Sequence, residues 1–336
     1  MIIKVNINDG YDIVLQRGIL KNAGEYLDLN RKVFIITDDG VPAVYSQQVA
    51  SCCKFSHIET VKSGEESKSL ATFEKLLKKM LELGFSRGDC VVAVGGGVVG
   101  DLAGFTAASY MRGIDFYNIP TTVLSQVDSS IGGKTAVNFC GVKNIVGAFY
   151  QPKKVLIDPE TLSSLPPRQI SNGLAESVKM ALTSDAKLFE LFETEGPLEN
   201  IDEIIAKSID IKRIVVEQDE KETGLRKILN FGHTIGHAIE SAENLSHYYH
   251  GECVALGMTF MCSDSVKSRL EAVLEKLSLP VAADVDFDKI WSAMCHDKKF
   301  DGDSITVIYV PEAGNFEMKT YTKDELKNHM QGVFAK

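Results

Sequence analysis

The sequence predicts a two-domain protein: an α/β domain with a mostly parallel sheet over residues 1–160, and a mainly α-helical domain over residues 161–336. Its 336 residues are about twice the length of a typical domain. The first half alternates short β-branched runs with segments of helical periodicity, whereas nearly every segment from about 166 to 297 carries apolar residues at helical spacing. Alternation of strands and helices is typical of a parallel sheet covered on both faces.

Short apolar runs define the strands of the first half. RKVFIIT and CVVAV are continuously apolar and β-branched, as expected for strands buried on both faces. The expected strands are 2–7, 11–16, 31–37, 90–94 and 115–120, and helical periodicity appears around 43–53 and over 67–83.

Long amphipathic segments define the second half. A helical run that includes Glu176 is expected to start after the breaker Pro166-Pro167, with Glu176 near its beginning. The segments 201–219 and 225–243 are each expected to form one long helix. Residues 304–310 are the one late segment with strand character.

Composition narrows the class of function. Lys plus Arg is 36 and Asp plus Glu is 46, so the net charge is −10, which disfavours nucleic acid and membrane surfaces as partners. An anionic substrate would therefore need a local basic cluster. The seven cysteines contain no CxxC pair, which indicates reduced thiols in a cytoplasmic protein. No signal peptide and no apolar run of membrane-spanning length are recognised.

A glycine-rich turn follows the expected strand 90–94. Gly95, Gly97 and Gly100 have the G-x-G-x-x-G spacing, and an apolar helical segment follows Asp101. Such glycines let the backbone approach a pyrophosphate, and the helix N-terminus supplies free N–H groups. The pattern predicts a Rossmann-like dinucleotide site, the alternative being a turn without ligand. The acidic residue usual about 20 residues further on has no clear counterpart, so the ribose must be recognised elsewhere.

Histidines concentrate between residues 233 and 250. His233 and His237 are four residues apart on an expected helix and so share a face, and a glycine precedes each of them. Position 234 is Thr, so the glutamate of HExxH metalloproteases is missing. The pair is either structural or metal-binding, and His250 favours a metal. Catalytic zinc usually takes three protein ligands, and Glu176 is a plausible carboxylate among them.

Small polar residues surround several basic side chains. Residues 120–135 combine Ser, Thr and Gly with Asp128 and Lys134, a composition that also suits a surface linker. The basic residues that lie in or beside such segments, or near the histidines, are Lys134, Lys143, Lys179, Lys212 and Arg226. Together they would form the pocket that an acidic protein needs for a phosphate or carboxylate.

These segments resemble the 3-dehydroquinate synthase family of sugar-phosphate cyclases from about residue 31 to residue 310. The similarity lies in GGGVVGDLAGF, YMRGIDFYNIPTTVLSQVDSSIGGKTAVN, GVKNIVGAFYQP, GLAESVKMAL, RKILNFGHTIGHAIE and HGECVALGM. The resemblance implies an N-terminal NAD-binding domain, a C-terminal metal-binding domain and a homodimer. It also implies conversion of 3-deoxy-D-arabino-heptulosonate 7-phosphate to 3-dehydroquinate in the shikimate pathway, without a nucleic-acid or membrane partner.

The resemblance also assigns roles to matching residues. Glu176, His233 and His250 resemble the ligands of one divalent metal, zinc or alternatively cobalt. Residues that resemble NAD contacts are Glu65, Lys68, Gly95, Gly96, Gly97, Asp101, Thr121, Thr122, Lys134 and Lys143. The substrate shell is implied to contain Asp128, Lys134, Asn144, Lys179, Lys212, Arg226, Asn230 and His237. Arg112 resembles an arginine that reaches the neighbouring subunit's site, and either Lys298 or Lys299 resembles a phosphate contact.

Other interpretations stay open. A metal-dependent polyol or alcohol dehydrogenase of the same fold would share the glycine turn and a histidine pair, but would not need Lys134, Lys212, Arg226 and Asn230. Another sugar-phosphate cyclase is a nearer alternative, and a non-catalytic paralogue a third. Arg226 and Asn230 are expected to share a helix face with His233 and His237 within 225–243. Lys212 and Arg226 would then bind the substrate carboxylate, unless they pair with the acidic residues that connect their helices.

Overall fold

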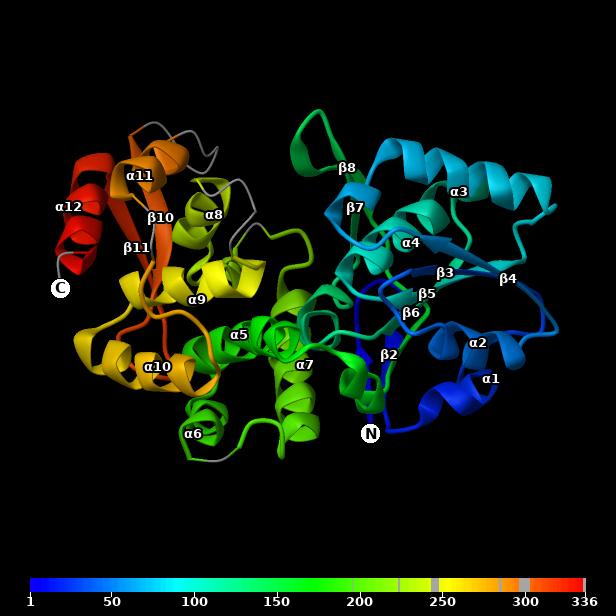
Figure 1. Cartoon of the computed structure of the whole chain (residues 1–336), viewed down its shortest axis with the longest axis horizontal. Coiled ribbons are helices and arrows are strands. Elements are labelled where there is room, and N and C mark those ends of the chain that lie inside the picture. Colours follow the sequence, from blue (N-terminus) through cyan, green and yellow to red (C-terminus); the bar gives the residue numbers. More distant parts are fainter. Residues whose placement is uncertain (195, 223, 243–247, 284–285, 296–302, 335–336) are drawn as a thin grey trace. The chain divides into compact units, whose positions relative to one another are not determined.

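The computed structural model describes the chain except residues 195, 223, 243–247, 284–285, 296–302 and 335–336 (Figure 1). The chain divides into two compact units, Met1–Pro166 and Pro167–Lys336. The first is α/β and the second mainly helical, which confirms the predicted fold class. Within the described segments, every helix is too short or too polar to cross a lipid bilayer.

A seven-stranded sheet forms the centre of the first unit, in the order β1-β2-β9-β6-β5-β3-β4. Only the β1–β2 pair is antiparallel. The strands are β1 (Ile2–Val5), β2 (Tyr11–Leu15), β3 (Lys32–Asp38), β4 (Phe55–Val61), β5 (Cys90–Gly95), β6 (Asp115–Pro120) and β9 (Lys154–Ile157). The sequence patterns predicted five of these strands but missed β4, which is partly exposed, and the short β9.

Helices cover both faces of this sheet, with α3 and α4 on one side and α1 and α2 on the other (Figure 1). The helices are α1 (Ala23–Tyr26), α2 (Ala43–Ser51), α3 (Leu70–Glu82) and α4 (Gly97–Ser109). Val91 and Ala93 of β5 pack in the core on the α3–α4 side, whereas Val92 and Val94 pack in the core on the other side. Because alternate side chains enter two cores, β5 has to be apolar at every position.

A second, two-stranded sheet follows the π-helical turn η4 (Ser125–Ser129). It is the antiparallel hairpin of β7 (Lys134–Phe139) and β8 (Val142–Phe149). The sequence patterns predicted neither strand. Hairpin strand β8 is largely exposed, so it lacks the apolar alternation that marks a half-buried strand.

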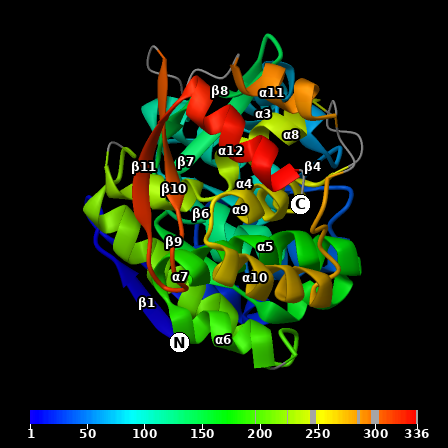
Figure 2. The same ribbon diagram turned by 90° about the vertical axis from the view of Figure 1, so that its left-hand side faces the viewer.

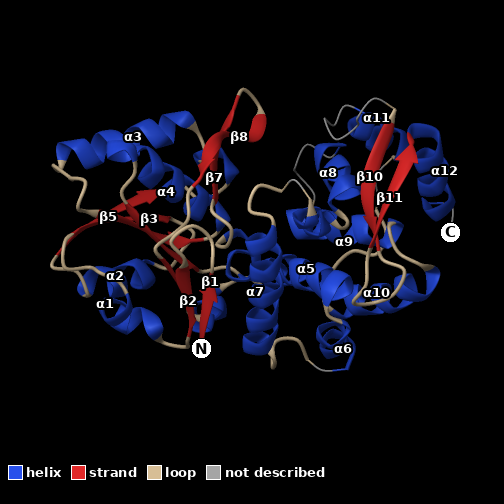
Figure 3. Ribbon diagram, turned by 180° about the vertical axis from the view of Figure 1, so that it is seen from behind, coloured by secondary structure: helices blue, strands red, loops and turns tan. Residues whose placement is uncertain are grey.

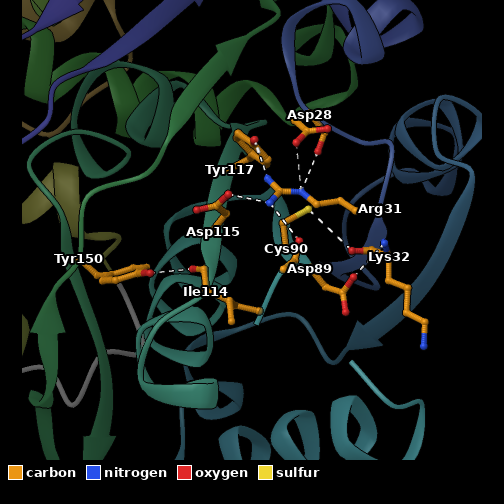
Figure 4. A network of polar contacts seen from close by, with 10 residues as sticks. Asp28, Arg31, Lys32, Asp89, Cys90, Ile114, Asp115, Tyr117 and Tyr150 are labelled. Atoms are coloured by element: carbon orange, nitrogen blue, oxygen red, sulfur yellow. Dashed lines mark hydrogen bonds and ion pairs between the residues drawn. The ribbon is translucent and has the colours of Figure 1, made fainter. Parts of the chain in front are cut away.

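Ionic contacts join the amino ends of three strands (Figure 4). The guanidinium of Arg31 donates to Asp115 Oδ2 at 2.7 Å and to the Tyr117 hydroxyl at 2.9 Å, and its Nε donates to the Asp28 carbonyl at 3.0 Å. Cys90 lies in the same network, and burial raises the pKa of its thiol to about 12. This network connects β3, β5 and β6 at the edge opposite to the glycine turn, which lies at the carboxyl end of β5.

Eight α-helices, one 3₁₀ segment and a hairpin make up the described part of the second unit. The helices are α5 (Pro167–Ser184), α6 (Ala186–Thr194), α7 (Ile201–Gln218), α8 (His233–Ala242), α9 (His250–Phe260), α10 (Asp264–Lys276), α11 (Phe287–Cys295) and α12 (Lys323–Phe334). The hairpin of β10 (Ser304–Tyr309) and β11 (Glu317–Thr322) lies beside α12 (Figures 1 and 2). Figure 3 shows the predominance of helix in this unit.

Three expectations for the second unit were wrong. Segment 225–243 is not one helix: the 3₁₀ segment η6 (Leu225–Asn230) ends before Phe231, Gly232 has a φ of +76°, and α8 begins at His233. Glu176 lies in the middle of α5 rather than near its beginning, because the helix already starts at Pro167. The strand predicted within 304–310 is present as β10 but is not the one late strand, because β11 pairs with it.

Candidate metal centre and cofactor region

Helices α8 and α9 pack with their backbones in contact because glycines face each other. A Cβ added at Gly257 would lie 1.9 Å from the Gly232 carbonyl oxygen, and one at Gly236 would lie 2.8 Å from the Cys253 carbonyl oxygen. Real Cβ atoms do not come this close to another backbone. The glycines before His233 and His237 therefore allow another element, α9, to approach closely.

Helix α5 approaches α9 in the same way. A Cβ at Gly251 would lie 1.9 Å from the Asn172 carbonyl oxygen, and the Gly251 N–H donates to Asn172 Oδ1 at 2.6 Å. Glu176 follows Asn172 by one helical turn and so lies on the same face of α5. This close approach brings the Glu176 carboxylate next to His250, the first residue of α9.

The side chains of Glu176, His233, His237 and His250 converge from helices α5, α8 and α9. Glu176 Oε1 lies 3.6 Å from His233 Nε2 and 3.7 Å from His250 Nε2. Ring nitrogens of His233, His237 and His250 all lie within 4.8 Å of one another. Tetrahedral ligands about 2.0–2.1 Å from a zinc-type ion lie about 3.3–3.4 Å from each other. The Glu176–histidine spacings therefore need only a few tenths of an ångström of adjustment to hold a metal.

The carboxylate of Glu176 has the character of a ligand. It is fully buried, and Lys179 donates to its Oε2. Its Oε1 has no hydrogen-bond partner among the described residues, although it faces two imidazoles. A buried carboxylate oxygen without a partner is costly, and a metal ion would compensate that cost. The residues present thus fit a divalent metal.

Both nearby imidazoles are oriented by their Nδ1 atoms. His233 Nδ1 lies 3.2 Å from the Phe231 carbonyl oxygen, and His250 Nδ1 lies 3.3 Å from Glu240 Oε2. In each histidine, the contact of Nδ1 leaves Nε2 directed at Glu176. Burial, and next the charge of Lys179, lower the pKa of His233 well below its usual value. Burial also acts to lower the pKa of His250, but the hydrogen bond that His250 donates to Glu240 and the charge of Glu176 raise it overall.

The basic residues expected around the substrate are buried in the second unit. Lys179, Lys212 and Arg226 are 1%, 5% and 3% exposed. Ser208 bonds Ser177 at 3.0 Å across the α5–α7 contact, and Lys212 follows Ser208 by one turn. Lys212 therefore lies on the face of α7 that packs against α5, the helix that carries Lys179.

Arg226 and Asn230 occupy a different position from the one expected. They lie on η6, which ends before Gly232, so they do not share a helix face with His233 and His237. Instead, Arg226 donates through its backbone N–H to Asp219 Oδ2 at 3.0 Å and through its guanidinium to the Glu220 carbonyl. Asn230 Nδ2 donates to Glu222 Oε1 at 2.7 Å. The acidic connection after α7 thus contacts both residues. For Arg226 this agrees in part with the alternative interpretation, in which the acidic residues between the helices pair with Lys212 and Arg226.

The glycine turn of the first unit joins β5 to α4. Gly95 ends the strand, Gly96 is the N-cap and Gly97 is the first helical residue. A Cβ at Gly95 would lie 2.7 Å from Val99, and one at Gly96 would lie 3.2 Å from Thr122 Cγ2. Gly95 is needed for close packing against Val99, and the turn leaves free N–H groups at the start of α4.

Four of the expected cofactor and substrate residues meet around one buried amine. Lys68 is 5% exposed, and its ammonium contacts Asp101 and Asn144 and lies 4.0 Å from Glu65 Oε1. Asn138, which the sequence did not single out, donates to Glu65 Oε1 at 2.8 Å. The structure thus brings together Glu65, Lys68, Asp101 and Asn144 although up to 79 positions separate them along the chain.

Several expected residues lie at the edges of the first unit. Lys134 and Lys143 are exposed on the β7–β8 hairpin, and Arg112 is exposed after α4 with a φ of +69°. Asp128 is partly buried in the π-helical turn η4, a type of turn that occurs often at functional sites. Lys298 and Lys299 lie outside the described residues.

Sequence reasoning missed one carboxylate beside the glycine turn. Asp38 ends β3, and continuing the β3–β5 register by two residues places it opposite Gly95. It lines a cavity of about 590 Å³ with Gly40, Pro42 and Thr60 among others. Burial raises the pKa of Asp38, against the backbone N–H groups of Gly40 and Val41, which lower it. The dinucleotide fingerprint places its acidic residue after the glycine motif, whereas Asp38 precedes the motif, at the end of β3.

The fold and the side chains together define the class of protein. One unit is α/β and has a glycine turn of the dinucleotide-binding type, and the other is helical and has a buried cluster of histidines and a carboxylate. The family model of the 3-dehydroquinate synthase N-terminal part matches residues 58–172, and that of the C-terminal part matches residues 173–300. The chain belongs to the 3-dehydroquinate synthase family.

Curated relatives agree over nearly the whole chain. A 3-dehydroquinate synthase of Streptococcus suis (strain 05ZYH33) is 40% identical, with 98% of this chain and 100% of the relative covered. One from Streptococcus sanguinis (strain SK36) is 41% identical, with 98% and 99% covered.

Solved structures of other cyclases are also similar. A 2-deoxy-scyllo-inosose synthase complexed with carbaglucose-6-phosphate, NAD⁺ and Co²⁺ has a TM-score of 0.88 at 28% identity and covers 99% of this chain and 100% of its own. The 2-epi-5-epi-valiolone synthase of Streptomyces hygroscopicus subsp. jinggangensis 5008, with NAD⁺ and Zn²⁺ bound, has a TM-score of 0.86 at 27% identity, with 96% of both chains covered. An iron-containing alcohol dehydrogenase, at 15% identity and a TM-score of 0.64, shares the fold alone.

Proposed function

We propose that this protein converts 3-deoxy-D-arabino-heptulosonate 7-phosphate to 3-dehydroquinate and phosphate, using NAD and one divalent metal. The observation that carries this proposal is the identity of about 40% to curated 3-dehydroquinate synthases over 98% of the chain. The buried oxygen of Glu176, which faces His233 and His250, supports the metal in particular.

The chemistry explains why both groups are needed. In the substrate, a phosphate lies β to a secondary alcohol, and the intervening C–H is not acidic until the alcohol becomes a ketone. Elimination of phosphate then becomes feasible, after which the ketone is reduced, the ring opens and an aldol closure forms the carbocycle. When bound, NAD accepts and returns a hydride, and the metal supplies Lewis acidity to the substrate oxygens.

Residues of the second unit would hold the metal and the anionic groups of the substrate. Glu176, His233 and His250 would bind the ion, which we propose to be zinc, with cobalt as an alternative. His237 would orient a hydroxyl proton instead of binding the metal. Lys179, Lys212, Arg226 and Asn230 would bind the carboxylate and phosphate, which together carry about three negative charges at neutral pH.

Residues of the first unit would hold NAD and the remaining substrate oxygens. The start of α4, at Gly95, Gly96 and Gly97, would bind the pyrophosphate. Asp38 would accept a hydrogen bond from a ribose hydroxyl, because a carboxylate at the end of the neighbouring strand performs this role in dinucleotide-binding sheets. Further contacts to NAD are assigned to Glu65, Lys68, Asp101, Thr121, Thr122, Lys134 and Lys143, and contacts to substrate to Asp128, Lys134 and Asn144.

We also propose a cytoplasmic homodimer in which Arg112 reaches the partner's site. Arg112 is exposed shortly after the end of α4 and has a left-handed backbone conformation. Crosslinking and light scattering would test the dimer. Complementation between Arg112→Ala and Glu176→Ala subunits would test the shared site, because a mixed dimer would regain one intact centre.

The substrate assignment has one serious competitor, another sugar-phosphate cyclase. Buried Lys212 and Arg226 favour a substrate that carries a carboxylate in addition to phosphate. The direct test measures phosphate release from the heptulosonate phosphate and from a hexose 6-phosphate, with and without NAD and chelator. Release from the heptulosonate phosphate alone, abolished by chelator, is expected. Release only from the hexose phosphate would contradict the proposal.

A further inference from the structure

His250 has a polar partner on the side of its ring away from Glu176. Its Nδ1 lies 3.3 Å from Glu240 Oε2, and its Nε2 lies 3.7 Å from Glu176 Oε1. The ring thus lies between two carboxylates, one of which faces the candidate metal position. The Glu240 side chain is 12% exposed and so is largely removed from bulk water.

Glu240 belongs to the same helix face as the other two histidines. It follows His237 by three residues and His233 by seven, which is the spacing of one face of a helix. Helix α8 therefore directs two imidazoles and one carboxylate toward the start of α9. None of the roles assigned to this site so far includes Glu240.

The two candidate histidine ligands are oriented by different means. His233 relies on the main-chain carbonyl of Phe231, which belongs to the same turn and moves with it. His250 begins α9 and relies on a side chain of another helix. The start of α9 is itself fixed, because Glu252 accepts from the Tyr249 N–H at 2.7 Å and from Arg168 at 2.6 Å. These contacts fix the backbone of His250 but leave the rotation of its ring to Glu240.

We propose that Glu240 is a positioning residue for the metal centre: its carboxylate holds His250 with Nδ1 protonated and Nε2 directed at the metal. Such carboxylate–histidine–metal arrangements fix the tautomer and raise the basicity of the ligand, and removing the outer carboxylate typically weakens metal binding about 10–100-fold. This inference rests on the proposed metal site but not on the identity of the substrate.

The test compares metal affinity in full-length protein from which metal has been removed. Zn²⁺ binding is measured by competition with a chromophoric chelator, and the Co²⁺ absorption spectrum reports the geometry of the site. Glu240→Gln keeps the shape of the side chain and removes its charge. The matched control is Glu271→Gln on α10, where Glu271 forms only a partly exposed pair with Lys267 at 3.8 Å.

In Glu240→Gln, Zn²⁺ affinity should fall about 10–100-fold and the Co²⁺ spectrum should change, while the thermal midpoint of the metal-free protein stays within about 2 °C of the parent. Glu271→Gln should behave like the parent in all three measurements. Glu240→Ala should weaken metal binding at least as strongly as Glu240→Gln.

Unchanged Zn²⁺ affinity and an unchanged Co²⁺ spectrum in Glu240→Gln would overturn the inference. So would a fall in affinity matched by an equal loss of stability in the metal-free protein, because Glu240 would then have only a structural role. A parent protein that binds no metal would refute the metal centre and the inference together. A parent that binds metal but releases no phosphate would refute only the proposed reaction.

Discussion

The two candidate sites of this chain are built in opposite ways. In the first unit, the glycine turn Gly95–Gly97 is a local motif between a strand and the helix that follows it. In the second unit, Glu176, His233 and His250 come from three helices that only packing brings together. A local motif can be recognised from consecutive residues of the sequence, whereas the candidate metal cluster depends on contacts between distant segments.

Glycine has a different task in each region. At Gly96 an added Cβ would meet only the Thr122 side chain, and the absence of a side chain would leave the backbone open for the proposed pyrophosphate. At Gly251 and Gly257 it lets helices touch backbone to backbone. A side chain at the turn should thus mainly weaken ligand binding, whereas one at the helix contacts should disrupt both packing and the metal cluster.

The largest effect on stability and on the metal cluster together is expected for Gly251→Ala. The new methyl would overlap the Asn172 carbonyl oxygen, which is backbone and cannot rotate away. The helices α5 and α9 must separate, at a cost of about 3 kcal/mol in the free energy of unfolding, and His250 moves away from Glu176. Urea unfolding and Zn²⁺ binding measure both losses. The control is Gly332→Ala on α12, where an added Cβ meets nothing within 4 Å. Equal behaviour of the two variants would contradict the packing argument.

Arg226→Ala should lose turnover while keeping metal and NAD. Removing one partner of a buried charge pair costs about 2–5 kcal/mol, so kcat/KM for the heptulosonate phosphate should fall from about 30-fold to several thousand-fold. The matched control is Arg213→Ala, whose side chain forms a helix-surface pair with Asp210 at 2.8 Å. If Arg226→Ala kept near-normal kcat/KM, the carboxylate would be bound elsewhere and other sugar-phosphate cyclase activities would need testing.

Gly96→Val should affect the cofactor without affecting the metal. A branched side chain would crowd Thr122 and block the approach of a pyrophosphate to the start of α4. We expect NAD to bind at least tenfold more weakly, a loss of about 1.4 kcal/mol, with Zn²⁺ affinity unchanged. Gly88→Val, at a turn with open space, is the control. Titration calorimetry that finds the parent's NAD affinity in Gly96→Val would place the pyrophosphate elsewhere.

The smallest effect on the sites is expected at the opposite edge of the sheet. Arg31→Ala removes the contacts to Asp115 and Tyr117 (Figure 4). A partner left unsatisfied in a partly buried network costs about 1–3 kcal/mol. Stability should fall by that amount, while NAD affinity and Zn²⁺ affinity stay the same. A large loss of NAD affinity would show that the two ends of the sheet are coupled.

Sequence patterns predicted the features that depend on local order. Strand β5 and the turn after it follow from a continuous apolar run and three glycines, and both are where the patterns placed them. The sequence patterns did not predict the hairpin of β7 and β8, because β8 is exposed and has no apolar alternation. The sequence patterns also did not predict the break at Gly232, because apolar periodicity continues across it. The left-handed backbone of this one glycine redirects the chain.

In the candidate sites too, the sequence predicted what depends on local order and not what depends on packing between distant segments. Histidine spacing marked His233 and His237, but only the packing of α5 against α9 shows that Glu176 faces His233 and His250. Asp38 was missed because the neighbouring strand in space precedes the glycine motif in sequence. Glu240 has the helical spacing of the histidines, yet nothing in that spacing shows which ring it contacts.

One measurement tests the central claim most directly: anomalous diffraction at the zinc edge from crystals of the protein grown with Zn²⁺ and NAD. The account predicts a single peak bonded to Glu176 Oε1, His233 Nε2 and His250 Nε2 at about 2.0–2.2 Å, with His237 close by but not bonded. A peak coordinated by His237 in place of His250, or one that excludes Glu176, would contradict it.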